Sequence, residues 1–195
     1  MKLVQHKYLE CSDEELMVLI INKDESAFHV LYERYSKNVQ RYFYRMLYQN
    51  IDIANDATQD LFIKIYEKAN LFDAKQKFST WLFSVAHNQC KNYYRSRSRK
   101  PEEVELDGLE ARFSNPSTDE KVDLSVFNNA LEKALIALPE DQKNLFVLRY
   151  QEAFSIVEIA EITEKATGTI KSGLHRTIKK LSKALAPYHP KNMES

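Results

Sequence analysis

Glycine, proline and cysteine are all scarce in this sequence. The 195 residues include only 3 Gly and 5 Pro. A sheet protein with many tight turns would need more of both, so the composition favours helices. The two cysteines, Cys11 and Cys90, lie far apart and belong to no Cys-x-x-Cys motif. This spacing argues against a zinc site and against a secreted disulfide scaffold.

Long apolar runs are missing as well. The longest, Leu16–Ile21, is far too short to span a membrane, and residues 1–7 contain no apolar core of a signal peptide. The sequence therefore predicts a cytoplasmic protein without membrane insertion. It also has no P-loop, no glycine-rich phosphate loop and no nucleophile-elbow motif. We therefore expect neither an enzyme nor a bound cofactor.

The net charge is zero, but the charges are unevenly distributed. Residues 87–100 contain five Lys or Arg and no acid, and residues 165–183 contain six and no acid. Residues 101–128, between these two blocks, contain eight acids and two bases. Basic blocks in a neutral chain can still bind a polyanion locally. The distribution is therefore compatible with nucleic-acid binding.

Helical patterns fill most of residues 1–100. Ser12 and Glu15 have the spacing of a capping box, and apolar residues then recur at intervals of three and four. Ser79 or Thr80 is expected to cap a long helix that ends before Pro101. Four helices are predicted. The first follows the Ser12 cap, the next two cover Phe28–Met46 and Ile53–Ala69, and the last follows the cap at Ser79 or Thr80.

A second helical unit is predicted for residues 124–186. Residues 101–123 before it are acidic and poor in apolar side chains, which predicts a flexible linker. Ser155 and Glu158 match a second capping box, and a basic helix follows from about Thr167 to Leu185. Its inward positions are expected at Ile170, Leu174, Ile178, Leu181 and Leu185. The predicted fold class is thus all-α, with two small helical domains joined by an acidic linker.

Residues 154–181 have the pattern of a helix-turn-helix. Two helices stand a few residues apart, and the second is basic outside and apolar inside. Such a helix fits the major groove of DNA, where hydroxyls and cations can contact base edges and phosphates. The candidate contacts are Thr167, Thr169, Lys171, Ser172, His175 and Arg176. An ordinary amphipathic helix with a solvated basic face is the alternative interpretation.

Five segments of the second unit, in chain order, are Ala137–Gln142, Phe146–Tyr150, Ser155–Ile162, Gly168–Ser172 and Leu174–Arg176. Together they resemble region four of the extracytoplasmic-function (ECF) sigma factors of bacterial RNA polymerase. The resemblance implies recognition of the minus-thirty-five promoter element and docking on the flap of the polymerase β subunit.

Three residues depart from the family pattern. Glu164 and Lys165 stand where the family usually has Gly and an apolar residue. A left-handed turn costs a non-Gly residue about 1 kcal/mol, so we expect this turn to be built differently. Gly173 stands where the family often has Arg, which removes a possible phosphate contact and places a weak helix former inside the helix.

The first unit resembles sigma region two. Residues 55–62 match the polymerase-binding helix of the family, which implies contacts of four side chains with the coiled coil of the β′ subunit. These side chains are Asp56, Gln59, Asp60 and Phe62. Residues 77–83, 86–88 and 92–95 resemble the segment that opens the minus-ten element.

The residue types of that segment suit single-stranded DNA. Bases stack on aromatic side chains, worth roughly 1–3 kcal/mol per base, while cations follow the backbone. A flipped base also needs a polar pocket, for which Asn88 and the loop 73–78 are candidates. The implied minus-ten contacts are Lys77, Ser79, Trp81, Asn88, Lys91, Tyr93, Tyr94 and Arg95. Trp81 fits a core position better than a base platform, and Tyr93 and Tyr94 fit both.

Asp52, Asp56 and Asp60 are four residues apart and line one helical face. A metalloenzyme could use them as ligands together with His87, but the Glu-x-x-His pairs of helical di-metal sites are absent. A solvated or partner-facing acidic stripe is the favoured interpretation, and no metal site is predicted.

The sequence as a whole is similar to an ECF sigma factor, a transcription initiation subunit that directs core RNA polymerase to specific promoters. Residues 1–100 would bind polymerase and melt the minus-ten DNA, residues 101–123 would be the linker, and residues 124–186 would read the minus-thirty-five DNA. The implied partners are the β and β′ subunits, promoter DNA and an anti-sigma factor. Because two weak modules gain avidity on one scaffold, we expect poor promoter binding by the free protein. A stand-alone helix-turn-helix regulator and a sigma-like decoy that binds polymerase without initiating are the alternatives.

Overall fold

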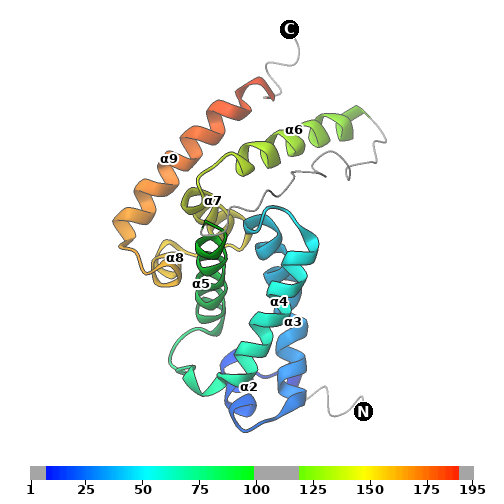
Figure 1. Ribbon diagram of the computed structural model, residues 1–195, viewed down its shortest axis with the longest axis vertical. Helices are drawn as coiled ribbons and strands as arrows, with labels where there is room; N and C mark the ends of the chain where they lie inside the picture. Colours follow the sequence, from blue (N-terminus) through cyan, green and yellow to red (C-terminus); the bar gives the residue numbers. More distant parts are fainter. Residues whose placement is uncertain (1–7, 99–118, 189–195) are drawn as a thin grey trace.

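Every regular element in the described part of the chain is a helix. The structure is a computed structural model that describes residues 8–98 and 119–188. The first domain comprises α2 (Asp13–Ile21), α3 (Glu25–Met46), α4 (Ile51–Glu67), a 3-10 turn (Ala69–Leu71) and α5 (Phe78–Ser98). The second comprises α6 (Asp119–Ile136), α7 (Glu140–Phe146), a π turn (Val147–Gln151), α8 (Ile156–Thr163), α9 (Thr167–Leu185) and a 3-10 turn (Ala186–Tyr188). The all-α prediction with two helical domains is confirmed (Figure 1).

Both predicted capping boxes are present. Ser12 and Ser155 each accept a hydrogen bond from the backbone N–H three residues on, and Glu15 and Glu158 accept one in return from the cap residue. Asn50 caps α4 by accepting from two backbone N–H groups, so that this helix begins at Ile51 rather than at Ile53 as predicted. Each cap satisfies donors that the first helical turn would otherwise leave unpaired.

The predicted cap of α5 is wrong. The helix begins at Phe78, so Ser79 and Thr80 lie inside its first turn. The Phe78 N–H donates instead to the carboxylate of Glu14 on α2, at 2.8 Å. A side chain 64 positions away in the sequence thus satisfies this helix terminus, which local patterns could not reveal.

The C-terminal end of the predicted linker, residues 101–123, overlaps the start of α6. Residues 99–118 lie outside the described residues, but α6 already begins at Asp119. The helix therefore starts before the boundary near residue 124 that the composition suggested.

The turn between α8 and α9 corrects a second prediction. Glu164 adopts the left-handed conformation, with φ 55° and ψ 37°, which is the conformation that a Gly would favour here. Its N–H donates to the carbonyls of Ala160 and Glu161, and the Lys165 N–H donates to the Ala160 carbonyl at 3.0 Å. The expectation of a differently built turn is wrong, because these bonds hold a non-Gly residue in the usual geometry.

Gly173 is buried where α9 packs on α7. A Cβ atom added to it would lie 2.5 Å from Cδ1 of Leu145, which is closer than atoms of two packed side chains can approach. The position faces the protein interior, so the lack of a side chain serves helix packing here. The sequence had indicated only a missing phosphate contact and a weakened helix.

Most predicted core positions are buried. Ala57, Leu61 and Ile65 of α4 face the first domain's interior, and Ile170, Leu174 and Leu181 of α9 face the second's. Ile178 is the exception, with 36% of its surface exposed, and Leu185 is half-buried. The inward stripe of α9 is therefore narrower than predicted towards its C-terminal end.

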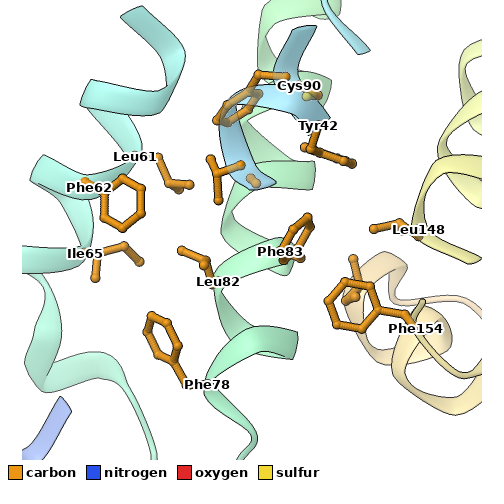
Figure 2. Packing of buried hydrophobic residues seen from close by; sticks show 14 of the residues in the cluster. Tyr42, Leu61, Phe62, Ile65, Phe78, Leu82, Phe83, Cys90, Leu148 and Phe154 are labelled. Atoms are coloured by element: carbon orange, nitrogen blue, oxygen red, sulfur yellow. The ribbon is translucent and has the colours of Figure 1, made fainter. Parts of the chain in front are cut away.

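The two domains pack against each other. In Figure 1, α7 and α8 lie beside α5, while α6 and α9 extend away from the first domain. Phe83 of α5 and Phe154, just before α8, point toward one another with ring centroids 4.9 Å apart (Figure 2). Leu148 lies in the same group of side chains. Apolar residues of both domains thereby form one continuous buried cluster.

Candidate nucleic-acid interface

The six predicted contacts on α9 are all exposed. Ile170, Leu174 and Thr177 fix the opposite face of the helix in the interior, so the helical periodicity turns the polar residues outward. The exposed set is Thr167, Thr169, Lys171, Ser172, His175 and Arg176. This face can offer hydroxyls, an imidazole and two cations to a DNA groove.

The first turn of α9 adds no acidic side chain, and Ala166 at its N-cap makes no side-chain bond. Lys165, in the turn before it, forms a 2.9 Å ion pair with Asp141 of α7. This pair fixes the turn to the preceding helix. The N-terminal end of α9 therefore presents its positive helix dipole and its hydroxyls without a competing carboxylate on the helix itself.

The predicted minus-ten residues spread over the length of α5 and the loop before it. Lys77, Lys91 and Arg95 are exposed, and Ser79 and Asn88 are half-buried. Lys77 is the one among them with an ion pair to the second domain: its Nζ lies 2.6 Å from Oε1 of Glu158 on α8. This contact, with the hydrogen bonds that the Ser155 cap donates, lowers the pKa of Glu158 to about 2.

The three predicted aromatic contacts are half-buried. Trp81 packs against Phe72 and Phe78, with centroids 5.3 and 6.1 Å away, which fits the core role preferred from sequence. The hydroxyl of Tyr94 donates to the backbone carbonyl of Met46, and burial raises its pKa far above the usual value.

Tyr93 and Tyr94 form a cluster with Tyr48 at the C-terminal end of α5. The three rings are 6.0 to 6.4 Å apart, and the Arg97 guanidinium lies 4.3 Å from the centre of the exposed Tyr48 ring. An exposed ring paired with a cation can stack on a base and hold its phosphate. Sequence reasoning missed Tyr48 and Arg97, because Tyr48 lies in the turn after α3, far from α5 in the sequence.

Three of the four predicted polymerase contacts share an exposed face of α4. Asp56, Gln59 and Asp60 are exposed, whereas Phe62 is only 2% exposed. The Phe62 ring packs edge-on against Phe28 and Tyr32 of α3, at 6.3 and 4.8 Å. The role predicted for Phe62 as a direct contact is therefore wrong for this structure, since its side chain belongs to the core.

Ile63 occupies the exposed position on that face instead. It follows Asp56, Gln59 and Asp60 at helical spacing, and 55% of its surface is exposed. A single exposed apolar side chain is ordinary, but this one lies among the predicted partner-facing residues. The helical spacing from Asp56, Gln59 and Asp60 could have identified Ile63 from the sequence in place of Phe62.

The acidic stripe does not form a metal site in the described structure. Asp52, Asp56 and Asp60 are exposed on α4, while His87 is buried and bonded to Asn144 of α7. Among residues 8–98 and 119–188, no three His, Cys, Asp or Glu side chains are grouped so that they could hold a metal ion. No helix in these ranges is long and apolar enough to cross a membrane.

Comparison with known proteins supports both halves of the chain. Residues 31–100 match the Sigma-70 region 2 family and residues 128–181 match the Sigma-70 region 4 family. The chain is 32% identical over 172 residues to the ECF RNA polymerase sigma factor SigW of Bacillus subtilis (strain 168), which covers 83% of this chain and 90% of SigW. The chain belongs to the ECF sigma factors. It is also 28% identical over 191 residues to the ECF RNA polymerase sigma-E factor of Escherichia coli (strain K12), covering 91% and 96% of the two chains.

Solved structures share the fold of this sigma factor. RpoE of Bartonella quintana, solved with the anti-sigma factor NepR, superposes with a TM-score of 0.68 at 23% identity, covering 82% of this chain and 96% of that one. CnrH, solved with the cytosolic domain of CnrY, gives 0.67 at 20% identity, with 89% and 97% coverage. At this level of identity the likeness concerns the fold. Sigma factors are transcription initiation factors that bind DNA, not enzymes.

Proposed function

We propose that this sigma factor directs core RNA polymerase to specific promoters, with α9 reading the minus-thirty-five element and α5 holding the melted minus-ten strand. The observation that carries the proposal is the set of six exposed polar and basic side chains on α9, on a helix whose opposite face is buried. Two basic surfaces on separate domains suit two separate promoter elements.

The minus-ten role rests on the basic and aromatic character of α5. Lys91 and Arg95 are exposed for phosphates, and Tyr93 lies at the edge of the Tyr48 cluster for stacking. Asn88 is half-buried, as expected of a polar group at the mouth of a base pocket. Promoter melting by this helix is therefore chemically reasonable.

The partners of the proposal are core polymerase and promoter DNA. Asp56, Gln59, Asp60 and Ile63 would meet the β′ subunit, and the second domain would meet the β flap. The fold neighbours RpoE and CnrH were solved with an anti-sigma factor and with the cytosolic domain of CnrY, which supports our expectation of an anti-sigma partner.

The structure weakens the basis of the decoy alternative. That alternative rested on Glu164, Lys165 and Gly173 as signs of a spent recognition helix. Glu164 takes the left-handed geometry of the turn, Lys165 pairs with Asp141, and Gly173 fits against Leu145. All three are accommodated in a regular helix-turn-helix, so none of them argues against DNA recognition.

Run-off transcription with core polymerase on a pool of promoter fragments tests the proposal. We expect discrete start sites that disappear in the double variant Asp60→Ala, Ile63→Ala. Arg176→Ala should lower promoter affinity of the holoenzyme by about 10- to 100-fold, as for the loss of one base or phosphate contact worth about 1–3 kcal/mol. Glu10→Ala, an exposed position before α2, is the control and should keep the start sites.

Three other outcomes would contradict the proposal. Polymerase binding without any start site would favour the decoy. Sequence-specific DNA binding without polymerase binding would favour the stand-alone regulator. Start sites that persist in the Asp60, Ile63 variant would show that this face of α4 does not bind polymerase.

A further inference from the structure

Two carboxylates in the first turn of α2 bond to other helices. The Glu14 carboxylate accepts a hydrogen bond from the backbone N–H of Phe78, the first residue of α5, at 2.8 Å. The Asp13 carboxylate accepts from Nη1 of Arg34 at 2.7 Å and from the hydroxyl of Tyr35, both on α3. The first turn of α2 thereby ties α3 and α5 to one place.

The bond to Glu14 takes the place of a local cap on α5. The first backbone N–H groups of a helix have no partner within it, and Lys77, the residue before α5, has a side chain that can only donate. Phe78 is 0% exposed, so water does not reach its N–H in this structure. The start of α5 therefore depends on an acceptor that α2 supplies.

The ring of Phe78 lies in an aromatic cluster that the same turn of α2 helps to fix. The centre of this ring is 5.3 Å from that of Tyr35 and 5.8 Å from that of Phe72. Tyr35 is the residue whose hydroxyl bonds to Asp13. The two carboxylates thus act on Phe78 in two ways, since Glu14 holds its backbone and Asp13 holds a ring that packs on its side chain.

Phe72 and Phe78 flank the loop that is the candidate pocket for a flipped base. Both rings are buried, whereas residues 73–77 between them are all exposed. Within the loop, the Gln76 N–H donates to the Asp73 carbonyl at 2.8 Å. The loop is therefore a tight turn whose two ends are fixed by the aromatic cluster and whose exposed residues can meet DNA.

We propose that Asp13 and Glu14 are positioning residues for promoter melting, which hold the loop 73–78 and the start of α5 in the geometry that receives an unpaired base of the minus-ten element. This inference rests on the proposed function, since it concerns how the same site is held. A binding pocket must be held to within about 0.5 Å, and a displacement of about 1 Å removes much of its effect. In this proposal α2 itself touches no DNA.

Removal of single bases from the promoter tests this role. The probe is the non-template single strand of the minus-ten element, taken from a promoter mapped by run-off transcription, with one abasic site placed at each position in turn. In the natural holoenzyme, loss of the captured base should lower the affinity about tenfold, as for one stacked base. Glu14→Ala removes the acceptor of the Phe78 N–H. We expect the abasic effect to shrink to about twofold or less in this variant, because Glu14 and the captured base are coupled.

Three further variants separate positioning from a loss of stability. Glu14→Gln keeps an acceptor oxygen and should restore most of the abasic effect. Ser12→Ala removes the cap of α2 itself, which weakens the same helical turn but leaves the acceptor of Phe78 in place, so the full effect should remain. Tyr35→Phe removes only the hydroxyl that bonds to Asp13 and should lower the effect to about threefold. Should Glu14→Ala fail to bind core polymerase, the comparison of Tyr35→Phe with Ser12→Ala gives the same test.

The results distinguish this inference from the proposed function. An abasic effect that keeps its natural size in Glu14→Ala and Tyr35→Phe would overturn the positioning role and leave the promoter role intact. An equal loss in Ser12→Ala would overturn it as well, because a general weakening of α2 would then explain the loss. Failure of the natural holoenzyme to give any start site, or any abasic effect, would refute the proposed function and the positioning role with it.

Discussion

Glu164 shows how a single residue departs from its local preference without changing the fold. Its left-handed backbone costs a side chain with a Cβ about 1 kcal/mol, yet the hydrogen bonds from its own N–H and from Lys165 end α8 in the same way as a glycine would. The cost is small beside the burial of Ile159 and Ile162 on the same helix. Packing therefore decides the turn, and the local cost remains as stored strain.

Glu164→Gly should therefore stabilise the protein. The left-handed conformation costs Gly nothing, although its more flexible unfolded state offsets part of the gain, so we expect the free energy of unfolding to rise by up to about 1 kcal/mol. Urea denaturation measures the change. Glu164→Ala is the control: it removes the carboxylate but keeps the strain, so it should give no gain. An equal gain in both variants would mean that the charge of Glu164 was the cause.

At the scale of the elements, helix packing explains the glycine in α9. Helix propensity alone would favour Ala over Gly at position 173 by about 1 kcal/mol. A Cβ there would require the Leu145 side chain on α7 to move. Because such a movement in a close-packed interior loses other contacts, we expect its cost to outweigh the propensity. The same contact holds α9 in the orientation that exposes its recognition face.

The pair formed by Gly173 and Leu145 should behave as a coupled unit. Overpacking costs about 1–3 kcal/mol, so Gly173→Ala alone should lower the free energy of unfolding despite its better propensity. Leu145→Ala alone should cost about 2–5 kcal/mol through the cavity it leaves. In the Leu145→Ala background, Gly173→Ala should become stabilising by about 1 kcal/mol. A double-mutant cycle measured by denaturation checks this, and additive effects would contradict it.

At the scale of the whole molecule, the charge state of one histidine is linked to the fold. His87 is buried at the contact of the two domains, and burial, with Lys91 and Lys165 nearby, lowers its pKa to about 4, while Asp141 acts in the opposite direction. The folded protein therefore favours the neutral imidazole. The ordinary pKa of His is about 6.5, so the unfolded chain takes up the proton first as the pH falls.

The stability should therefore be pH-dependent in a defined window. The contribution of neutral His87 is complete above pH about 6.5 and is lost as the pH falls from there to about 4, with a slope of up to about 1.4 kcal/mol per pH unit. The depressed pKa of Glu158 acts lower, below its ordinary value of about 4.5. Urea denaturation between pH 4 and 8 measures the slope. His87→Asn should flatten it between pH 6.5 and 4.5, and an unchanged slope would exclude His87 as the cause.

The sequence by itself determined the helical content, most of the helix positions and the exposed face of α9. These depend on contacts within a few residues, such as the two capping boxes and the apolar spacing of Ala57, Leu61 and Ile65. The family resemblance followed from the same local segments. Local sequence patterns reflect interactions between residues that are close together in the chain, so they predicted these local features.

Only the tertiary structure decided which side chains meet across the chain. The Glu14 carboxylate that receives the Phe78 N–H, the burial of Phe62, the fit of Gly173 on Leu145 and the Tyr42–Asn144–His87 junction all join residues far apart in sequence. No periodicity encodes such pairs, because each depends on how two already formed helices pack. The contact between the two domains belongs to this class, since apolar residues from both of them form one buried cluster.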